Sequence, residues 1–234
     1  ITKGTVALFV SQSGETADTL AALRYCEGKA DTILSVVNVP ESSIARESDL
    51  ALPIFAGVEV GVASTKAFTC QLTVLLSLAL KAASDRGEIT PKQLADHVAS
   101  MRNIPALINA AIDKDAQMQS AARKISEARD VLFLGRGVMY PLAHEGALKL
   151  KEISYIHAEA YASGELKHGP IALVDKHVPV VVMAPRDPLF DKSVSNMQEV
   201  MARKGKVILI SDAQGLKEAG EGIWATVEMP TVPD

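Results

Sequence analysis

The sequence predicts an α/β protein with two domains, each built on a parallel sheet flanked by helices. Short apolar runs alternate with helical patterns, which is the order of elements that produces parallel sheets. The same series of elements occurs twice, and 234 residues are more than one small domain needs. We expect a first domain over 1–90, a helical connector over 91–125 and a second domain over 126–234.

The first part of the chain alternates strands with helices. A run such as 5–10 (Thr-Val-Ala-Leu-Phe-Val) is typical of a strand that is buried on both faces. Gly28 supplies a stop for the helix that follows, and Ser64 or Thr65 is placed to cap a long apolar helix. The predicted strands are 5–10, 32–37 and 50–54, and the predicted helices are 16–26, 44–47 and 63–83.

Residues 85–130 show amphipathic helical patterns and no strand pattern, which favours a helical connector. A strand at 131–134, a glycine turn and a helix to 154 follow it. The stretch 158–170 has almost no apolar periodicity and carries several glycines, so we expect a functional loop there. The elements predicted after it are strands at 178–184, 206–210 and 223–228 and helices at 187–203 and 213–219.

The last series of elements repeats the first at an offset of about 173 residues, the distance from the strand at 5 to the strand at 178. We interpret this as an internal duplication. The second copy is preceded by an extra strand and helix (131–154), whereas the first copy is followed by a long helix (63–83). Each copy therefore lacks an element of the other. Together with the first residue, Ile1, this predicts a fragment of a longer protein.

Composition and charge exclude several classes of protein. Hydrophobic residues make up 48% and charged residues 22%, which is typical of a globular chain. The net charge of −4 offers no basic surface for nucleic acid. The longest apolar stretch, 72–83, is shorter than the ~20 residues that span a bilayer, so we expect no membrane segment.

The cysteines and histidines argue against disulfides and metal. Cys26 and Cys70 are too few for a secreted disulfide framework, and the N-terminus shows no signal-peptide pattern. We therefore expect a reducing, cytoplasmic setting. The histidines show no spacing typical of metal ligands, so we predict no metal site and no cofactor.

The segment 11–16 (Ser-Gln-Ser-Gly-Glu-Thr) follows a buried strand and opens a helix, at the edge where open α/β sheets bind ligands. Three hydroxyl side chains meet the free amides of the helix there, which favours an anion such as a phosphate. The segment lacks the Gly-Lys-Ser/Thr ending of a nucleotide-binding loop, so a sugar phosphate fits better than ATP. The alternative is that these residues only cap the helix.

Two further groups of residues have the chemistry of acid–base catalysis. Glu145, Lys149 and Glu152 share one face of a predicted helix, and that spacing alone favours surface ion pairing. The alternative is that the first turns of the helix direct a carboxylate and an ammonium into the ligand crevice. His168 lies in the predicted loop and titrates near neutrality, although a loop histidine is often simply solvated.

Three stretches carry a family resemblance: 11–20 (SQSGETADTL), 61–66 (GVASTK), and 148–161 (LKLKEISYIHAEAY) with 164–170 (GELKHGP). They closely resemble the isomerase part of the glutamine–fructose-6-phosphate aminotransferases, and the likeness covers nearly the whole chain. The resemblance implies two tandem sugar-isomerase (SIS) domains, each a three-layer, flavodoxin-like α/β domain. It also implies a homodimer, a glutaminase domain in the parent chain, and fructose 6-phosphate and glucosamine 6-phosphate as ligands.

The resemblance also implies roles for individual residues. Glu152 matches the base that moves a proton between C1 and C2 of the sugar. His168 matches a histidine that assists ring opening from the neighbouring subunit, and Lys149 matches a lysine beside the reacting carbons. The residues that would bind the phosphate or line the sugar are Ser11, Gln12, Ser13, Thr16, Val62 and Ser64.

The sequence departs from the family pattern at its ends and leaves two other functions open. The glutaminase domain, the C-terminal tail and the first strand and helix of the first SIS domain are missing, and neither cysteine substitutes for the glutaminase nucleophile. A stand-alone SIS isomerase or deaminase is one alternative. A non-catalytic sugar-phosphate-binding module is the other, but such a module has no use for Glu152 and His168.

Overall fold

The computed structural model describes residues 1–232 and contains two compact units, Ile1–Met101 and the residues from Arg102 onward. The boundary falls inside helix α4 (Pro91–Ile112), within the predicted connector. Residues 91–125, the expected connector, contain α4 and α5 (Asp115–Ile125).

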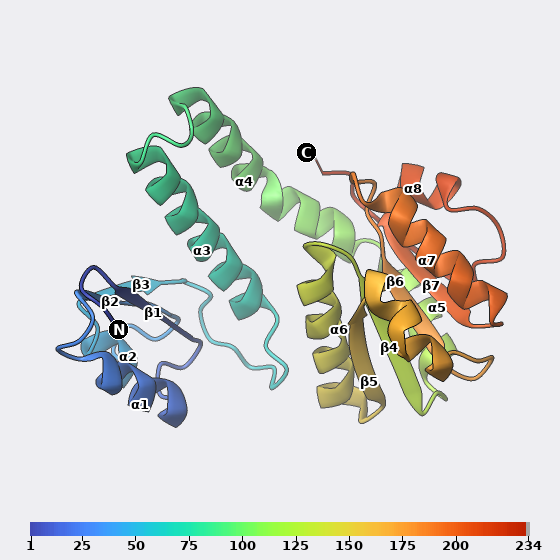
Figure 1. The fold of residues 1–234 in the computed structure, drawn as a ribbon, viewed down its shortest axis with the longest axis horizontal. Coiled ribbons are helices and arrows are strands. Elements are labelled where there is room, and N and C mark those ends of the chain that lie inside the picture. Colours follow the sequence, from blue (N-terminus) through green and yellow to red (C-terminus); the bar gives the residue numbers. More distant parts are fainter. Residues whose placement is uncertain (233–234) are drawn as a thin grey trace. The chain divides into compact units, whose positions relative to one another are not determined.

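The first unit contains a parallel three-stranded sheet in the order β1-β2-β3 (Figure 1). Its strands are β1 (Val6–Ser11), β2 (Thr32–Val37) and β3 (Leu50–Pro53), and its helices before α4 are α1 (Ala17–Cys26), α2 (Ser43–Arg46) and α3 (Lys66–Asp85). All these elements were predicted, with small differences at their ends.

Helices cover both faces of this sheet. On one face Leu23 of α1 and Ile44 of α2 pack on Ile33 and Val37. On the other face Val36 packs with Ala67 of α3. The cover on the α3 side is incomplete over β1, where side chains such as Val6 remain exposed.

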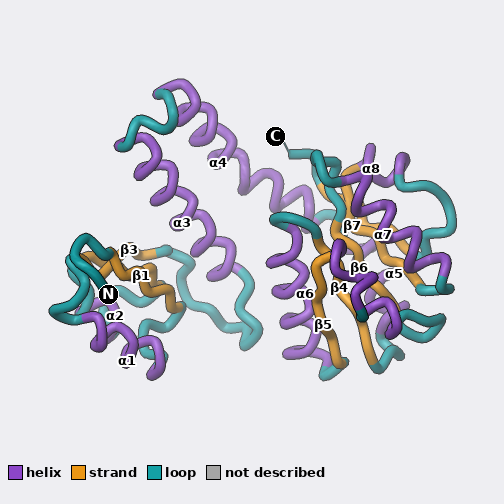
Figure 2. The backbone as a smooth tube through the Cα atoms, viewed as in Figure 1, coloured by secondary structure: helices purple, strands orange, loops and turns teal. Residues whose placement is uncertain are grey.

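The second unit contains a parallel five-stranded sheet in the order β5-β4-β6-β7-β8 (Figure 2). Numbered along this unit the order is 2-1-3-4-5, the doubly wound flavodoxin-like order that was predicted. The strands are β4 (Asp130–Gly135), β5 (His157–Ala162), β6 (Pro179–Met183), β7 (Lys206–Asp212) and β8 (Ala225–Met229). The remaining elements are α6 (Met139–Ser154), η1 (Ser163–His168), η2 (Pro170–Leu173), α7 (Phe190–Ala202) and α8 (Ala213–Glu218).

The two faces of the five-stranded sheet carry separate cores. On one face Leu166 of η1 and Met197 of α7 pack on side chains of β4, β6 and β7. On the other face Ala143 and Ala147 of α6 and Ala121 of α5 pack on the opposite side chains of the same sheet. The small alanines let α6 approach the strands closely. The sheet therefore separates α6 from η1.

Two expectations about local structure were wrong. Residues 157–162 form strand β5 and not a loop, and η1 follows directly. The alternation of Ala158 and Ala160, which are buried, with more exposed residues is the period-two signal that identifies this strand. Ser64 and Thr65 do not cap α3: the Glu59 carboxylate accepts hydrogen bonds from the Ala67 amide, at 3.0 Å, and from the Ser64 hydroxyl, at 3.4 Å.

Helix α3 is long and apolar enough to count as a candidate membrane segment, whereas we expected none. Its length and apolar composition would allow it to cross a membrane, and this is weak evidence by itself. Part of α3 packs on the sheet of the first unit through Ala67, Cys70 and Val74, as a covering helix of an α/β domain does. The hydroxyls of Thr69, Thr73 and Ser77 donate hydrogen bonds to backbone carbonyls of the same helix.

Candidate functional site

The segment 11–16 forms a tight turn between β1 and α1 in which the hydroxyls face the start of the helix. The Ser11 hydroxyl accepts a hydrogen bond from the Gly14 amide at 3.0 Å and lies 3.2 Å from the Thr16 hydroxyl. The Ser13 hydroxyl accepts from the Glu15 amide at 3.2 Å. Thr16 is the N-cap residue of α1, yet its side chain makes no capping hydrogen bond. The first amides of α1 are therefore not satisfied by the hydroxyl that sits beside them, which favours the anion interpretation over simple capping.

Gly14 fixes this turn against the N-terminus of α2. Its φ of +69° lies in the left-handed region, and a Cβ added there would lie 1.9 Å from the Ser42 hydroxyl oxygen. The Gly14 carbonyl accepts a hydrogen bond from the Ile44 amide at 3.0 Å, and the Gln12 carbonyl accepts from the Asn38 amide at 3.1 Å. The turn and α2 therefore hold each other in place.

The Glu15 side chain accepts a hydrogen bond at the start of α2, although Glu15 directly precedes α1 in the sequence. One of its carboxylate oxygens accepts a hydrogen bond from the Ser43 amide at 2.7 Å, at the first residue of α2. This backbone hydrogen bond lowers the pKa of Glu15, and the Ser43 side chain adds to the effect. Glu15 is thus part of the frame around the 11–16 turn, a role that its position in the sequence does not indicate.

Val62 and Ser64 lie in the loop between β3 and α3. Val62 is 97% exposed, and Ser64 has a φ of +50°. The loop is attached to the start of α3 by the Glu59 carboxylate and by the Lys66 ammonium, which donates to the Val58 carbonyl at 2.5 Å. Both predicted residues therefore lie in the same unit as the 11–16 turn.

The predicted charged cluster of the second unit is present on α6. The Lys149 ammonium lies 2.9 Å from a Glu152 carboxylate oxygen and 3.3 Å from one of Glu145. All three side chains are partly buried, with 23–34% of each exposed. Burial by itself lowers the pKa of Lys149, but the hydrogen bonds to Glu152 and Glu145 outweigh it and raise the pKa. Lys149 is therefore held as an ammonium between two carboxylates.

Glu152 lies in the last turn of α6 and not in its first turns. Helix α6 begins beside the carboxyl end of β4 and ends just before β5 starts at the opposite edge of the sheet. Thirteen residues separate Met139 from Glu152, which corresponds to about 20 Å along a helix. The position of Glu152 thus differs from the expectation that the first turns of α6 carry the carboxylate.

His168 ends the 3₁₀ helix η1, on the sheet face opposite to α6. Its ring is 71% exposed, and its Nδ1 atom lies 2.8 Å from a Glu165 carboxylate oxygen that is also exposed. Leu166, two residues earlier, is fully buried in the core on that face. Since α6 packs on the other face, the structure does not bring His168 and Glu152 together within one copy of the chain.

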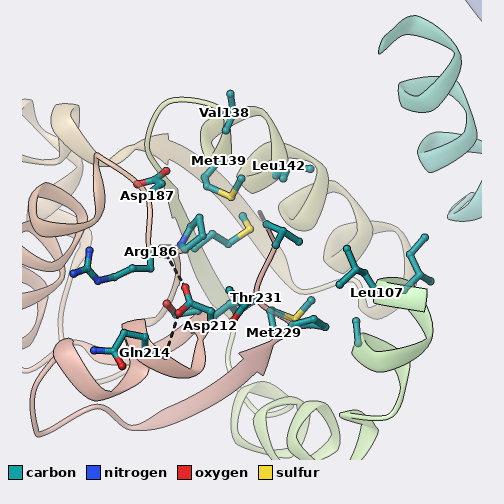
Figure 3. Close-up of a pocket in the computed structure, with 18 of the residues that line it drawn as sticks. Leu107, Val138, Met139, Leu142, Arg186, Asp187, Asp212, Gln214, Met229 and Thr231 are labelled. Atoms are coloured by element: carbon teal, nitrogen blue, oxygen red, sulfur yellow. Dashed lines mark hydrogen bonds between the residues drawn. The ribbon is translucent and has the colours of Figure 1, made fainter. Parts of the chain in front are cut away.

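A pocket of about 880 Å³ lies at the carboxyl ends of β6, β7 and β8 in the second unit (Figure 3). Its lining is mostly apolar and includes Leu107, Met139, Met183 and Met229. The three hydroxyl residues of the 11–16 turn have Ala184, Arg186 and Leu189 as counterparts at this edge. The second copy therefore lacks the three hydroxyls of the 11–16 turn.

The Asp212 carboxylate is the polar centre of this pocket, and it has a structural role. It accepts hydrogen bonds from the backbone amides of Arg186, Gln214 and Gly215 at 2.7–3.1 Å, which caps α8 (Figure 3). Burial raises the pKa of Asp212, but these hydrogen bonds outweigh it and lower the pKa overall.

Within residues 1–232 no group of three or more His, Cys, Asp or Glu side chains is arranged to hold a metal ion. Cys26 and Cys70 are free thiols on α1 and α3.

These features define the class of protein. The SIS-domain family matches residues 1–81 and 124–222, which correspond to the cores of the two units. The chain belongs to this family. Its tandem arrangement agrees with the duplicated strands and helices.

Individual relatives show which members of this family the chain is similar to. The chain is 59% identical over 98% of its length to a glutamine–fructose-6-phosphate aminotransferase [isomerizing] from Zymomonas mobilis, and 55% identical over its whole length to one from Brucella abortus. It spans only 38% and 39% of these relatives. A solved C-terminal domain of glucosamine-fructose-6-phosphate aminotransferase from Francisella tularensis matches 100% of this chain with a TM-score of 0.96 and 46% identity, and 66% of that domain is covered. The chain thus corresponds to part of the C-terminal, isomerase half of such enzymes.

We expect Gly14→Ala to loosen the junction between the turn and α2. The added Cβ meets the Ser42 hydroxyl, and alanine at positive φ costs about 1–2 kcal/mol in addition. Hydrogen exchange of the Ile44 amide, which donates to the Gly14 carbonyl, should become at least about tenfold faster. Gly28→Ala is the matched control, because Gly28 has a φ of +67° and nothing within 4 Å. Equal effects of the two variants on Ile44 would contradict the contact.

We expect the Glu15–Ser43 contact to depend on pH. Because the pKa of Glu15 is lowered in the folded state, its contribution to stability is present above the unfolded pKa and is lost as pH falls through the folded pKa. The stability gap between the native chain and Glu15→Gln should therefore shrink between about pH 5 and pH 3. Urea unfolding at each pH measures the gap, and Glu221→Gln, in an exposed loop, serves as the control. A gap that is constant over this range would exclude the contact.

Proposed function

We propose that this chain is the sugar-phosphate isomerase part of a glutamine–fructose-6-phosphate aminotransferase. The observation that carries the proposal is the 11–16 turn: three hydroxyls beside the uncapped start of α1, at the carboxyl edge of a parallel sheet. The close relatives that bear this activity in their names cover almost the whole chain. The complete reaction combines fructose 6-phosphate with ammonia released from glutamine and yields glucosamine 6-phosphate and water.

In this proposal the 11–16 turn holds the phosphate of the sugar. The hydroxyls of Ser11, Ser13 and Thr16 donate to phosphate oxygens, together with the amides at the start of α1 and the backbone at Gln12. The loop that carries Val62 and Ser64 lines the sugar. A fixed phosphate supplies binding energy and places C1 and C2 beside the groups that move the proton.

Glu152 is the proposed base for the conversion of the ketose to the aldose. Ammonia adds to the C2 carbonyl of the open sugar and loses water, which gives an imine. The Glu152 carboxylate then takes a proton from C1 and returns it to C2, while the proton of the C1 hydroxyl passes to the imine nitrogen, so that C2 carries the amine and C1 becomes the aldehyde. Lys149 lies 2.9 Å from this carboxylate and balances its charge, and Glu145 holds Lys149 from the other side.

His168 is the proposed group that opens the sugar ring, and it acts in the site of a second copy. It shifts a proton between the ring oxygen and the C2 hydroxyl, and its ring is exposed for such a contact. The five-stranded sheet separates His168 from α6 in one chain, so a complete set of groups requires two chains. We therefore propose a homodimer in the cytoplasm, with the glutaminase domain elsewhere in the parent chain.

Phosphate binding is testable in a chimera, namely the full-length Zymomonas mobilis relative in which this chain replaces the matching residues. Calorimetry with glucosamine 6-phosphate should show at least a tenfold loss of affinity for Ser13→Ala combined with Thr16→Val, since each hydrogen bond to a charged group is worth about 1.5–3 kcal/mol. Thr226→Val, at an exposed threonine of β8, is the control. Unchanged affinity in the double variant would place the phosphate elsewhere.

The shared site is testable by complementation in the same chimera. Glu152→Gln keeps the shape of the side chain but should lower isomerisation and exchange of the C1 proton by about 10²–10⁴, while phosphate binding survives. His168→Ala should also be inactive with the closed sugar. Random pairing of the two variants should restore about one quarter of the sites, because about half of the dimers are mixed and each mixed dimer has both native groups in one of its two sites. If the activity of Glu152→Gln stays within a few-fold of the native chimera, Glu152 is not the base and only forms an ion pair at the surface.

A further inference from the structure

Residues 163–173, which form η1 and η2, carry His168 and are connected to helix α7 at three positions. Asn196 and Glu199 lie on α7, and Arg203 is the residue that follows the last turn of this helix. Their spacing of three and four residues places them on one face of the helix. α7 therefore presents a row of polar groups along the whole segment.

Glu199 and Arg203 contact the segment directly, and Asn196 is connected to it through Arg136. Asn196 accepts a hydrogen bond from Arg136 at 3.2 Å, and the Arg136 guanidinium lies against Gly164. Glu199 lies 2.9 Å from the Lys167 ammonium. Arg203 donates to the carbonyl of Ile171 at 3.4 Å. The middle contact is the one directly beside His168 in the chain.

Glu199 is more buried than its partner. Its side chain is 23% exposed against 63% for Lys167, and its second carboxylate oxygen is buried without a hydrogen-bond partner in the described part of the chain. A carboxylate in such a position depends strongly on its one cation, because removal of that cation leaves a desolvated charge. The ion pair thus connects Lys167 to α7.

The His168 side chain itself has a weak local attachment. Its contact with Glu165 joins two exposed groups, and an ion pair of this kind contributes little to stability in water. The position of the ring is therefore set by the backbone on either side of it. Leu166 is fully buried on the preceding side, Lys167 is paired with Glu199, and Gly169 follows with a φ of +145°, which L side chains rarely adopt.

We propose that Glu199 is a positioning residue for His168 and acts through Lys167. The inference rests on the proposed function, since it gives His168 its task. The ion pair fixes the direction in which η1 presents the imidazole, so that the ring reaches the sugar of the neighbouring copy. Glu199 touches neither substrate nor reacting atoms in this arrangement.

The kinetic test uses the chimera and compares two glutamates in similar ion pairs. Glu199→Gln should lower kcat for isomerisation at least tenfold and change the KM for fructose 6-phosphate less than twofold. Glu199→Asp should recover to within threefold of the native value. Lys167→Met should match Glu199→Gln, and the double variant should be no worse than either single one. Glu228→Gln removes a pair of the same 2.9 Å length with Lys114 and should leave kcat unchanged.

A second readout does not depend on activity. Trypsin cuts after Lys167 only when η1 opens, so the rate of cleavage there reports the population of the displaced segment. In the 234-residue chain, Glu199→Gln should accelerate cleavage at this bond at least fivefold. Glu228→Gln should not, and cleavage after Lys217, on α8, should be the same in all variants. Mass spectrometry of the fragment beginning at His168 measures the rate.

The two tests separate the possible failures. If His168→Ala is fully active in the chimera, the proposed role of His168 is wrong, and cleavage at Lys167 still decides whether Glu199 fixes the segment. If His168→Ala is inactive but Glu199→Gln retains kcat within threefold, the positioning role of Glu199 is refuted. Equal cleavage rates in Glu199→Gln and the native chain also refute it.

Discussion

Parallel strand pairing is the constraint on which the rest of this structure depends. Parallel strands need a crossover between each pair, and their sheets are covered by helices on both faces, so all the strand-to-helix junctions fall at one edge. In the first unit this places the turn after β1 beside the start of α2, which follows β2. The close approach leaves no space for a side chain at Gly14, whose missing Cβ would meet Ser42. The hydroxyl turn is therefore shaped by its neighbour as much as by its own residues.

The helices on the two faces of the second sheet also decide where the proposed catalytic groups lie. Helix α6 packs on one face of the five-stranded sheet through small alanines, and η1 packs on the other through Leu166. Glu152 and His168 are sixteen residues apart in the sequence, yet a layer of strands lies between the elements that carry them. The proposed site needs both groups and therefore takes one of them from another copy of the chain. Under that proposal, association is a condition for activity and not only a source of stability.

Carboxylates from outside the helix bind the first amides of two helices of this protein. Glu59 accepts a hydrogen bond from the Ala67 amide of α3, where Thr65 makes no cap. Glu15 accepts from the Ser43 amide of α2, where the Ser42 hydroxyl also accepts from the Ala45 amide. At the start of α1 no side chain fills this role, although Thr16 stands at the N-cap. The N-cap residues of α5, α6 and α7 make no side-chain cap either. The start of α1 differs from these in the group of hydroxyls beside it, at Ser11, Ser13 and Thr16.

The sequence by itself determined the class of fold, the duplication, most of the strands and helices, and the cluster of hydroxyl residues in the 11–16 turn. These follow from apolar runs, glycine positions and hydroxyl clusters, which are local signals. It did not determine strand β5, because short alanines at Ala158 and Ala160 give a weak apolar pattern that only burial under α6 makes visible. Nor did it reveal that Glu15 and Glu59 accept hydrogen bonds at helix starts, or that Glu199 pairs with Lys167. It also did not show that Glu152 and His168 lie apart. These depend on contacts between distant segments, and only the packing of helices on the two faces of each sheet brings such segments together.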